Sequence, residues 1–405
     1  MIKNKDFYIL LFGRLISNLG DSIYSIGATL LVYKLSNSSF YSGITLFLTS
    51  STAIVQLILS PILDKINMKK FLVKSQLIQA FLLLIIPILY YFESLKVYQI
   101  MAIMPIISLI NQLVYPGQIS LLPQILPEDK LIRANSLMTM AYQGANAIFD
   151  SLAGFIISIL GFMVGFYIDS LTFIITTILF SFLSEKIVRA KNLYGRERLI
   201  KNHIRELKNA MEIFENPIIL SLILGIVFIN FSATAIGAVL PAFSKDEVFY
   251  SLVVSSMGLG VFLGSLFSSF SFFKKISLGK LYTCGIFLVG IFWLIFPMSY
   301  ENKFLALALY GAGWFIVGLV NVYGQTMVQI LVCKEKIASA MGVMIGISSF
   351  MAPFGALVGG WMGDFFGSFW AIFFASLIVI GVSIFWTLSG NIRKLPRIDK
   401  IHKDL

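Results

Sequence analysis

The chain has 405 residues, of which 58% are hydrophobic and 13% are charged, and its mean hydropathy is +0.88. An ordinary soluble domain is about 45–50% apolar and about 25% charged, so the composition excludes a soluble globular enzyme and indicates an integral membrane protein. The net charge of +11 does not require a nucleic-acid partner, because the Lys and Arg residues lie in short clusters between apolar stretches.

Twelve stretches of the sequence are long and apolar enough to cross a membrane as helices, for which about 20 predominantly apolar residues suffice. They are residues 7–33, 41–63, 71–92, 98–120, 135–160, 163–184, 217–241, 249–272, 281–299, 304–326, 337–361 and 368–390. Glycine is the main punctuation between the fifth and sixth stretches and between the eleventh and twelfth. The sequence therefore predicts an all-α integral membrane protein with twelve transmembrane helices.

The Lys and Arg residues predict the orientation of these helices. If the N-terminus is cytoplasmic, 26 of the 31 Lys and Arg residues lie in cytoplasmic segments, four lie in outer segments, and Arg14 lies inside the first helix. Such an excess marks the cytoplasmic side. We expect both termini to be cytoplasmic, in the cell membrane, with residues 391–405 forming a basic cytoplasmic tail.

The two halves of the chain are similar to each other. Shifting the sequence by 205 residues aligns loop and helix landmarks without a gap: Lys69-Lys70 with Lys274-Lys275, Gln124-Ile125-Leu126 with Gln329-Ile330-Leu331, Gly154 with Gly359, and Gly20 with Gly225. Residues 1–184 and 217–390 are therefore predicted to form two six-helix bundles. Six helices return the chain to its starting side, so the bundles share an orientation, are related by an axis along the membrane normal, and enclose a cavity between them.

Residues 185–216 join the two bundles and contain one predicted amphipathic helix. Apolar residues recur there at helical spacing from Ile200 to Phe214, with Lys and Arg elsewhere around the axis. Two interpretations remain open. The helix lies on the inner leaflet, or it packs on the loops as a linker helix.

The first span carries a polar stripe, in which Arg14, Asn18, Asp21 and Ser25 follow one another at spacings of four, three and four residues. A charge at the bilayer centre costs at least about 2.5–3.5 kcal/mol, so such residues avoid lipid and mark functional sites. The functional interpretation is that Asp21 binds a proton or a cationic group while Arg14 biases its protonation. The alternative is an ion pair that serves packing only.

Asp150, in the fifth span, is the second carboxylate within the membrane. If the protein couples to protons, Asp21 and Asp150 are the carboxylates able to carry them, because a carboxyl removed from water binds a proton more readily. The alternative for Asp150 is a structural hydrogen bond to Asn146, one turn earlier. Asp169, near the start of the sixth span, is expected to be structural.

Polar side chains also line one face of the fourth and tenth spans, which are equivalent in the repeat. Asn111, Tyr115 and Gln118 mark the fourth, and Asn321, Gln325 and Gln329 mark the tenth. We expect these residues, together with Asn18 and Ser25, to line a substrate cavity. The open alternative is that the amides join helices by hydrogen bonds.

Other features of the sequence bear on packing and exclude several chemistries. The Gly260-x-x-x-Gly264 and Gly342-x-x-x-Gly346 pairs predict close helix approaches. Two cysteines and two histidines cannot build a Cys/His metal site, so neither a metal nor another cofactor is expected. The sequence lacks the G-x-x-x-x-G-K-[ST] phosphate-binding loop, which excludes a self-contained ATP-driven pump. No nucleophile–base pair is recognisable in the spans, so we expect no enzyme.

The connection between the second and third spans, from Ser60 to Lys70, resembles the G-x-x-x-D-(R/K)-x-G-R-(R/K) signature of the major facilitator superfamily. Asp64, Lys65, Lys69 and Lys70 are in place, whereas Ser60 and Asn67 replace the two glycines. Three further segments are similar to the macrolide-efflux branch of bacterial drug exporters: Asn18-Leu-Gly-Asp21, the run from Leu126 to Ser136, and the run from Pro353 to Gly360.

The resemblance covers nearly the whole chain and implies the twelve-helix major facilitator fold, alternating access and proton-driven export of amphiphilic compounds from a bacterial cell. It implies that Asp64, with Lys65, Lys69 and Lys70, forms a cytoplasmic gating motif that latches the outward-facing state. Where the antiporter motif of that family has a Gly-Pro pair, this chain has Phe149-Asp150.

These observations together predict a secondary transporter, expected to be a monomer, that exports small hydrophobic or amphiphilic compounds in exchange for protons. Its partners would be the small-molecule substrate, protons and the lipid bilayer. Export of an endogenous metabolite, a siderophore or a lipid is one alternative. A non-transporting membrane sensor or immunity protein is another.

Overall fold

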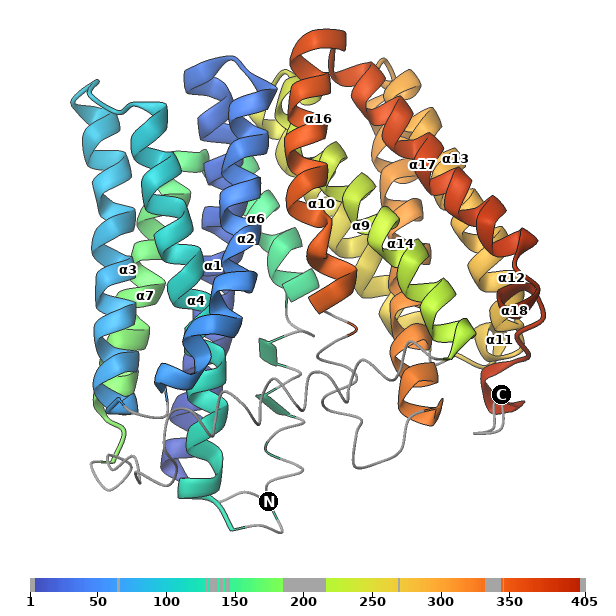
Figure 1. Ribbon diagram of the computed structural model, residues 1–405. Coiled ribbons are helices and arrows are strands. Elements are labelled where there is room, and N and C mark those ends of the chain that lie inside the picture. The colour runs from blue at the N-terminus through green and yellow to red at the C-terminus, as the bar shows by residue number, and fades with distance from the viewer. Residues whose placement is uncertain are drawn as a thin grey trace. The chain divides into compact units, whose positions relative to one another are not determined.

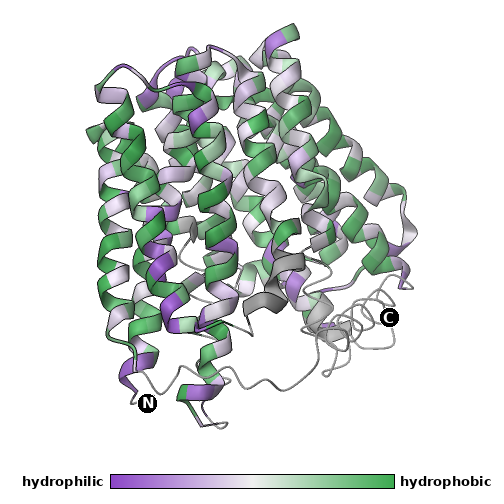
Figure 2. Cartoon of the chain, turned by 60° about the vertical axis from the view of Figure 1, so that its left-hand side comes forward, coloured by the Kyte–Doolittle hydropathy of each residue, from purple (hydrophilic) through white to green (hydrophobic). Residues whose placement is uncertain are grey.

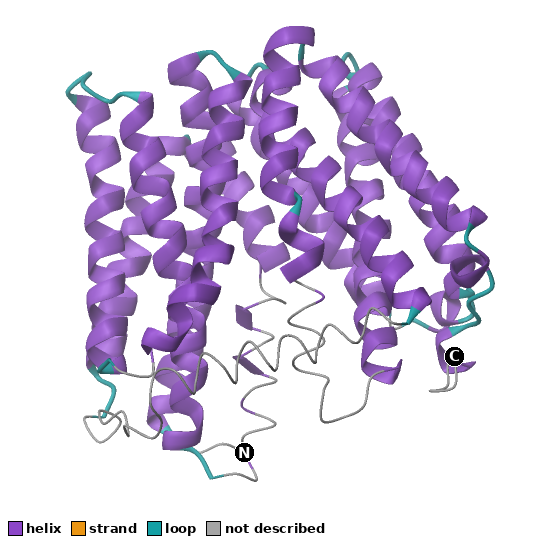
Figure 3. Cartoon of the chain, in the orientation of Figure 1, coloured by secondary structure: helices purple, strands orange, loops and turns teal. Residues whose placement is uncertain are grey.

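The structure is a computed structural model that describes residues 4–63, 66–127, 130, 134, 137–138, 141–142, 146–184, 216–268, 270–331, 344 and 346–400. The described secondary structure is helical, and short loops join successive helices (Figure 3). Nine helices in this part of the chain are long and apolar enough to cross a membrane. The predicted linker helix at 200–214 and the residues Asp64 and Lys65 lie outside the described residues.

Six helices of the first half correspond to the first six predicted spans. They are α1 (Lys5–Ser36), α2 (Ser39–Leu63), α3 (Met68–Tyr91), α4 (Val97–Ile125), α6 (Asn146–Leu160) and α7 (Phe162–Ser181). Local sequence sets several of their ends. Asn4 caps α1 by accepting a hydrogen bond from the Phe7 amide at 3.1 Å, and Asn67 caps α3 through the Lys70 amide at 3.0 Å.

The second half contains helices at the other six predicted spans. These are α9 (Pro217–Ser244), α10 (Glu247–Phe267), the run of α12 (Leu278–Lys280), η4 (Leu281–Gly285), α13 (Ile286–Ile295) and η5 (Phe296–Ser299), then α14 (Lys303–Leu331), α16 (Ala352–Phe366) and α17 (Ser368–Leu388). Three short elements, α11 (Ser271–Lys274), α18 (Gly390–Arg393) and η7 (Ile398–Lys400), lie between or after them. The all-α fold predicted from the apolar stretches is confirmed.

The two glycine joints are turns in the backbone. Gly161 separates α6 from α7 with φ of 80°, and Gly367 separates α16 from α17 with φ of 89°. Residues with a Cβ rarely adopt this region, so glycine allows two helices to follow each other with one residue between them. The two glycines lie 206 residues apart, one more than the repeat offset.

Helices pair in the same way in both halves of the chain. α1 packs against α6 and α7, as α9 packs against α16 and α17. α3 packs against α4 and α7, as α13 packs against α14 and α17 (Figure 1). Equivalent helices therefore have equivalent neighbours, as expected of a duplicated bundle.

The chain divides into two compact units that differ in detail from the predicted bundles. One unit contains Met1–Asn37, Leu48–Gly195 and Asp246–Ser255, and the other contains Ser38–Phe47, Arg196–Lys245 and Ser256–Leu405. The start of α2 therefore groups with helices of the second half. Asp364, at the end of α16, accepts hydrogen bonds from the backbone amides of Ser39 at 2.7 Å and Phe40 at 3.3 Å. The predicted domain boundaries stay a prediction.

Glycines permit very close helix contacts in the second unit. A Cβ at Gly264 of α10 would lie 2.0 Å from the Phe315 carbonyl oxygen of α14, and one at Gly260 would lie 2.3 Å from the Gly311 carbonyl oxygen. This confirms the predicted small-residue face of α10. A Cβ at Gly346 would meet no atom of the described residues within 4 Å, and Gly342 lies outside those residues, so the second predicted pair stays a prediction. Spacing alone does not show whether a glycine faces a neighbouring helix.

The outer surface of the helices is suited to lipid. Large apolar side chains are exposed along them, among them Phe81, Phe155 and Ile159. Figure 2 shows hydrophobic residues over most of the helix surface and hydrophilic residues at several helix ends. Because lipid replaces water around these side chains, their exposure costs little.

Candidate functional site

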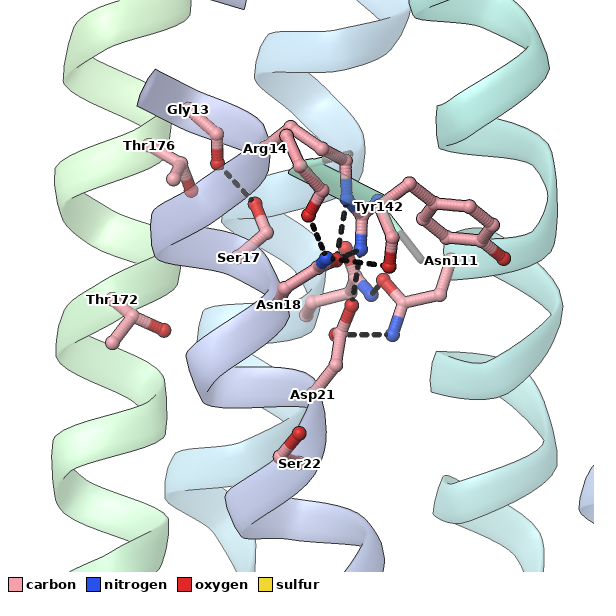
Figure 4. A network of polar contacts seen from close by, with 12 residues as sticks. Gly13, Arg14, Ser17, Asn18, Asp21, Ser22, Asn111, Tyr142, Thr172 and Thr176 are labelled. Carbon is pink, nitrogen blue, oxygen red and sulfur yellow. Dashed lines mark hydrogen bonds and ion pairs between the residues drawn. The ribbon is translucent and has the colours of Figure 1, made fainter. Parts of the chain in front are cut away.

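The polar stripe of α1 forms a buried ion pair. Arg14 Nη2 lies 2.7 Å from Asp21 Oδ2, and their side chains are 2% and 20% exposed. Arg14 Nε donates to Asn18 Oδ1 at 2.5 Å, and Arg14 Nη2 donates to the same oxygen. The three side chains point toward one another from successive turns of one helix (Figure 4). The predicted stripe therefore faces protein rather than lipid.

Asn18 connects this pair to the segment that precedes α6. Its Nδ2 donates to the carbonyl oxygens of Ala141 at 2.6 Å and Tyr142 at 3.1 Å. Residues 141–142 are π-helical, and such a turn alters the regular pairing of backbone carbonyls so that side chains can bond them. Single π-helical turns are frequent at functional sites.

Arg14 also contacts an aromatic stack. Its guanidinium carbon lies 4.9 Å from the centroid of the Tyr142 ring, which is a cation–π contact. The other partner of Tyr142 is Tyr115 of α4, with ring centroids 4.0 Å apart and planes 11° from parallel. The guanidinium is thus held by a carboxylate, an amide and a ring.

The second oxygen of Asp21 begins a chain of amides that crosses two more helices. Asn111 Nδ2 of α4 donates to Asp21 Oδ1 at 2.5 Å (Figure 4). Gln79 Nε2 of α3 donates to Asn111 Oδ1 at 2.5 Å, and Gln76 Nε2 donates to Gln79 Oε1 at 3.1 Å. We call Gln76, Gln79 and Asn111 the amide chain.

The amide chain ends between α1 and α7. Gln76 Oε1 accepts from Thr176 Oγ1 at 2.7 Å and from Ser17 Oγ at 3.1 Å. Gln76 and Gln79 are both fully buried. A single connected set of polar contacts therefore joins α1, α3, α4 and α7 within one unit.

Asp150 of α6 is hydrogen-bonded to α1. Its Oδ1 accepts from Ser22 Oγ at 2.5 Å, one residue after Asp21. Asn146, the partner considered from the sequence, has a side chain outside the described part of the chain. Asp169 of α7 is fully buried, and Gly20 makes room for it, because a Cβ there would lie 2.2 Å from Asp169 Oδ1.

These groups surround a cavity of about 210 Å³ within the first unit. It is lined by Arg14, Asn18, Asp21, Ser22, Tyr24, Ser25, Ser108, Asn111, Gln112, Tyr142 and Asp150. Pockets for drug-sized ligands measure about 300–1,000 Å³, so this one alone suits water, ions or one end of a larger molecule. Six of the residues singled out from the sequence meet here: Arg14, Asn18, Asp21, Ser25, Asn111 and Asp150.

The other predicted site residues lie elsewhere. Tyr115 touches the site through Tyr142, whereas Gln118 is fully buried on α4 and its amide has no hydrogen-bond partner among the described residues. Asn321 is exposed and Gln325 is half-buried on α14, in the second unit. Lys69 and Lys70 begin α3.

Sequence reasoning missed the residues that link the stripe to other helices. They are Ser17, Ser22, Gln76, Gln79, Tyr142 and Thr176. The available signal was the pair Gln76 and Gln79, two amides three residues apart on one face of a predominantly apolar span. Two buried amides in such a span indicate partners on neighbouring helices.

Comparison with known proteins assigns the chain to a family. A family model described as transmembrane secretion effector matches residues 2–404. The chain belongs to this family. It is 25% identical over 333 residues to the uncharacterized MFS-type transporter YkuC of Bacillus subtilis (strain 168), covering 79% of this chain and 75% of YkuC. It is 24% identical over 364 residues to YvqJ of the same organism, described in the same words, covering 87% and 84%.

Solved structures share the fold at low identity. The peptide transporter POT in complex with alafosfalin has a TM-score of 0.71 at 11% identity, covering 97% of this chain and 96% of that one. A bacterial homologue of the human lysosomal transporter Spinster, inward-facing and occupied, gives 0.70 at 13%, covering 94% and 95%. The nucleoside transporter NupG gives 0.70 at 13%, covering 94% and 98%. The protein is a multi-pass membrane transporter of the MFS type.

Proposed function

We propose that this family member is a secondary active exporter that carries small hydrophobic or amphiphilic compounds out of a bacterial cell by alternating access, in exchange for protons. The observation that carries the proposal is the Arg14–Asp21 pair, buried in the first helix and open to a cavity that also contains Asp150. The family description, secretion effector, supports the outward direction. The similarity to macrolide-efflux proteins supports amphiphilic compounds as the substrate class.

The charges around the cavity explain why a proton would bind there. Arg14 is always protonated in proteins, and two carboxyl groups, Asp21 and Asp150, face the same space. One guanidinium balances one carboxylate, so the site is neutral when the other carboxyl holds a proton. An uncompensated charge removed from water is strongly disfavoured.

The same balance gives a physical basis for exchange. A cationic or hydrogen-bond-donating compound near the cavity would stabilise the carboxylate form of Asp21 or Asp150 and release the proton. Loss of the compound on the far side would favour proton uptake again. Proton and substrate would thus compete for one negative charge, which is the requirement for antiport.

The proposal is tested in inside-out membrane vesicles with an imposed proton gradient. A growth panel of host cells with and without the protein first identifies compounds to which it gives resistance. Adding such a compound to energised vesicles should dissipate the gradient and load the compound. Asp21→Asn should abolish both effects.

Asp6→Asn is the matched control, because Asp6 lies on the same helix outside the cavity and accepts a hydrogen bond from the Ser184 amide at 3.0 Å. It should retain gradient-driven transport. Unchanged transport in Asp21→Asn would remove Asp21 from the mechanism. Resistance without any gradient-driven uptake would remove proton exchange.

A further inference from the structure

We infer that Gln79 and Gln76 are positioning residues that transmit the protonation state of Asp21 from α1 to the contact between α1 and α7. The inference rests on the proposed function only in taking Asp21 as the group that gains and loses the proton. It is based on the direction of the hydrogen bonds in the amide chain. These bonds can all run toward Asp21 or all run away from it, and each amide is paired in both arrangements.

In the arrangement that the structure shows, each amide donates toward Asp21. Gln76 donates to Gln79, Gln79 donates to Asn111, and Asn111 donates to Asp21 Oδ1. This order suits a carboxylate, which only accepts hydrogen bonds. Asp21 Oδ2 is bound separately by Arg14, so the two carboxylate oxygens have different partners.

A proton taken up from the aqueous phase onto Asp21 Oδ1 turns that oxygen into a donor. It then faces the Asn111 amino group, and two donors oppose each other. The amino group and the carbonyl oxygen of a side-chain amide have nearly the same size and shape. Asn111 can therefore turn its amide over, so that its oxygen accepts a hydrogen bond from Asp21. The Arg14 contact to Oδ2 is unaffected by this step.

The turn of Asn111 propagates along α3. Its amino group then faces Gln79, which must turn to accept, and Gln79 in turn donates to Gln76, which must also turn. The reversal breaks the long hydrogen bond from Gln79 Nε2 to the Ile107 carbonyl oxygen at 3.4 Å. The Tyr24 hydroxyl, which also bonds Asn111, can donate or accept and so serves both arrangements. Buried polar groups are rarely left unpaired, so the amides reverse together.

The far end of the amide chain accepts either direction. Ser17 Oγ lies 3.1 Å from Gln76 Oε1 and 2.9 Å from the Gly13 carbonyl oxygen. Thr176 Oγ1 lies 2.7 Å from Gln76 Oε1 and 2.9 Å from the Phe173 carbonyl oxygen. Each hydroxyl has one hydrogen, which can point to Gln76 or to its own helix. When it points to the helix, the hydroxyl oxygen is free to accept from a reversed Gln76.

Ionisable groups around Asp21 set the pH at which the reversal occurs. Four of them line the cavity with Asp21: Arg14 and Tyr24 of α1, Asp150 of α6 and Tyr142 of the π-helical turn. Asp169 of α7 interacts with the Asp21 charge, and Tyr115 of α4 stacks on Tyr142. Of these groups, Tyr24 also hydrogen-bonds Asn111, and its neutral hydroxyl can donate or accept in either arrangement. The direction of the hydrogen bonds in the amide chain therefore follows the protonation state of Asp21.

The test is side-chain amide NMR on the full chain in lipid nanodiscs, with isotope-labelled Asn and Gln assigned through single-substitution variants. On titration, resonances of Asn111, Gln79 and Gln76 should shift with one midpoint. In Asp21→Asn, the new amino group donates where the protonated carboxyl would. The resonances of Asn111, Gln79 and Gln76 should therefore stay at their low-pH positions at every pH in this variant. Gln118, a buried amide outside the chain, is the internal control and should stay fixed.

Gln79→Leu separates this role from a merely structural one. Asn111 should still follow Asp21 in this variant, and Gln76 should no longer move. The inference is overturned if Gln76 moves neither on titration nor in Asp21→Asn, or if it still moves when Gln79 is Leu. The titration of the unsubstituted protein decides the matter even if Gln79→Leu does not fold. Co-titration without transport in vesicles would refute proton exchange and leave the amide chain standing.

Discussion

Replacing Asp21 with Asn should destabilise the protein strongly, because the buried Arg14 loses the carboxylate that it contacts directly. Two unit charges about 4 Å apart attract by about 4 kcal/mol at an effective dielectric constant of 20. Removing one partner of a buried pair costs about 3–5 kcal/mol, and the Arg14 side chain is 2% exposed. The cost therefore falls near the upper end of single-substitution effects.

The assay is thermal unfolding in detergent, completed as a double-mutant cycle. For a unit of 150–250 residues, each kcal/mol shifts Tm by about 2–4 °C, so Asp21→Asn should lower Tm by about 6–20 °C. The double variant Arg14→Met with Asp21→Asn should recover most of this loss, because the Arg14 charge is removed together with its partner.

An exposed ion pair in the same unit provides the control. Lys34 pairs with Glu247, and their side chains are 42% and 28% exposed. Such pairs contribute about 0–1 kcal/mol, so Glu247→Gln should change Tm by about 4 °C at most. The reasoning is refuted if Asp21→Asn is no more destabilising than Glu247→Gln, or if the losses in the double variant simply add.

Three further predictions concern helix packing, a helix cap and the gating motif. Gly264→Ala places a Cβ 2.0 Å from a backbone oxygen of α14 and should lower the free energy of unfolding by about 1–3 kcal/mol in the same unfolding assay. The control is Gly381→Ala, whose Cβ would meet no described atom within 4 Å and which should be close to neutral. Equal losses of stability in the two variants would contradict the packing argument. Asp364→Ala removes the cap of α2 and should speed hydrogen exchange at residues 39–42, at a cost of about 0.5–2 kcal/mol; unchanged protection there would show that the cap is dispensable. Asp64→Ala should slow transport turnover more than it weakens ligand binding, and normal turnover would discard the gating motif.

The sequence was sufficient to predict what depends on one helix at a time. Length and hydropathy predicted twelve spans, and nine helices of the described residues are long and apolar enough to cross a membrane. The four-three-four spacing placed Arg14, Asn18, Asp21 and Ser25 on one face of α1, where they line one cavity. Glycine marked the two joints in the sequence, and the structure places a glycine with positive φ at each of them. These features are local, so their physical cause is contained in about twenty consecutive residues.

Contacts between helices could not be predicted in the same way. Periodicity shows that Gln76 and Gln79 share a face of α3 but not that Asn111 of α4 lies against it. The same limit applies to Asp364, whose contact with the start of α2 joins positions more than 300 residues apart. Partner choice depends on how helices pack, which a single sequence does not encode in its spacing.

The polar network of the first half has no counterpart at the equivalent positions of the second half. The second half has the same helix pairings, yet the residues 205 positions after Arg14, Asp21, Gln76, Asn111 and Thr176 are apolar, namely Ile219, Ile226, Leu281, Ile316 and Gly381. One bundle of this fold is therefore built without any of these groups. Since buried ion pairs and amides contribute little net stability compared with well-packed apolar residues, stability does not account for keeping them in the first half. We therefore expect that these groups serve the binding of a proton or a cationic group, as the proposed function requires.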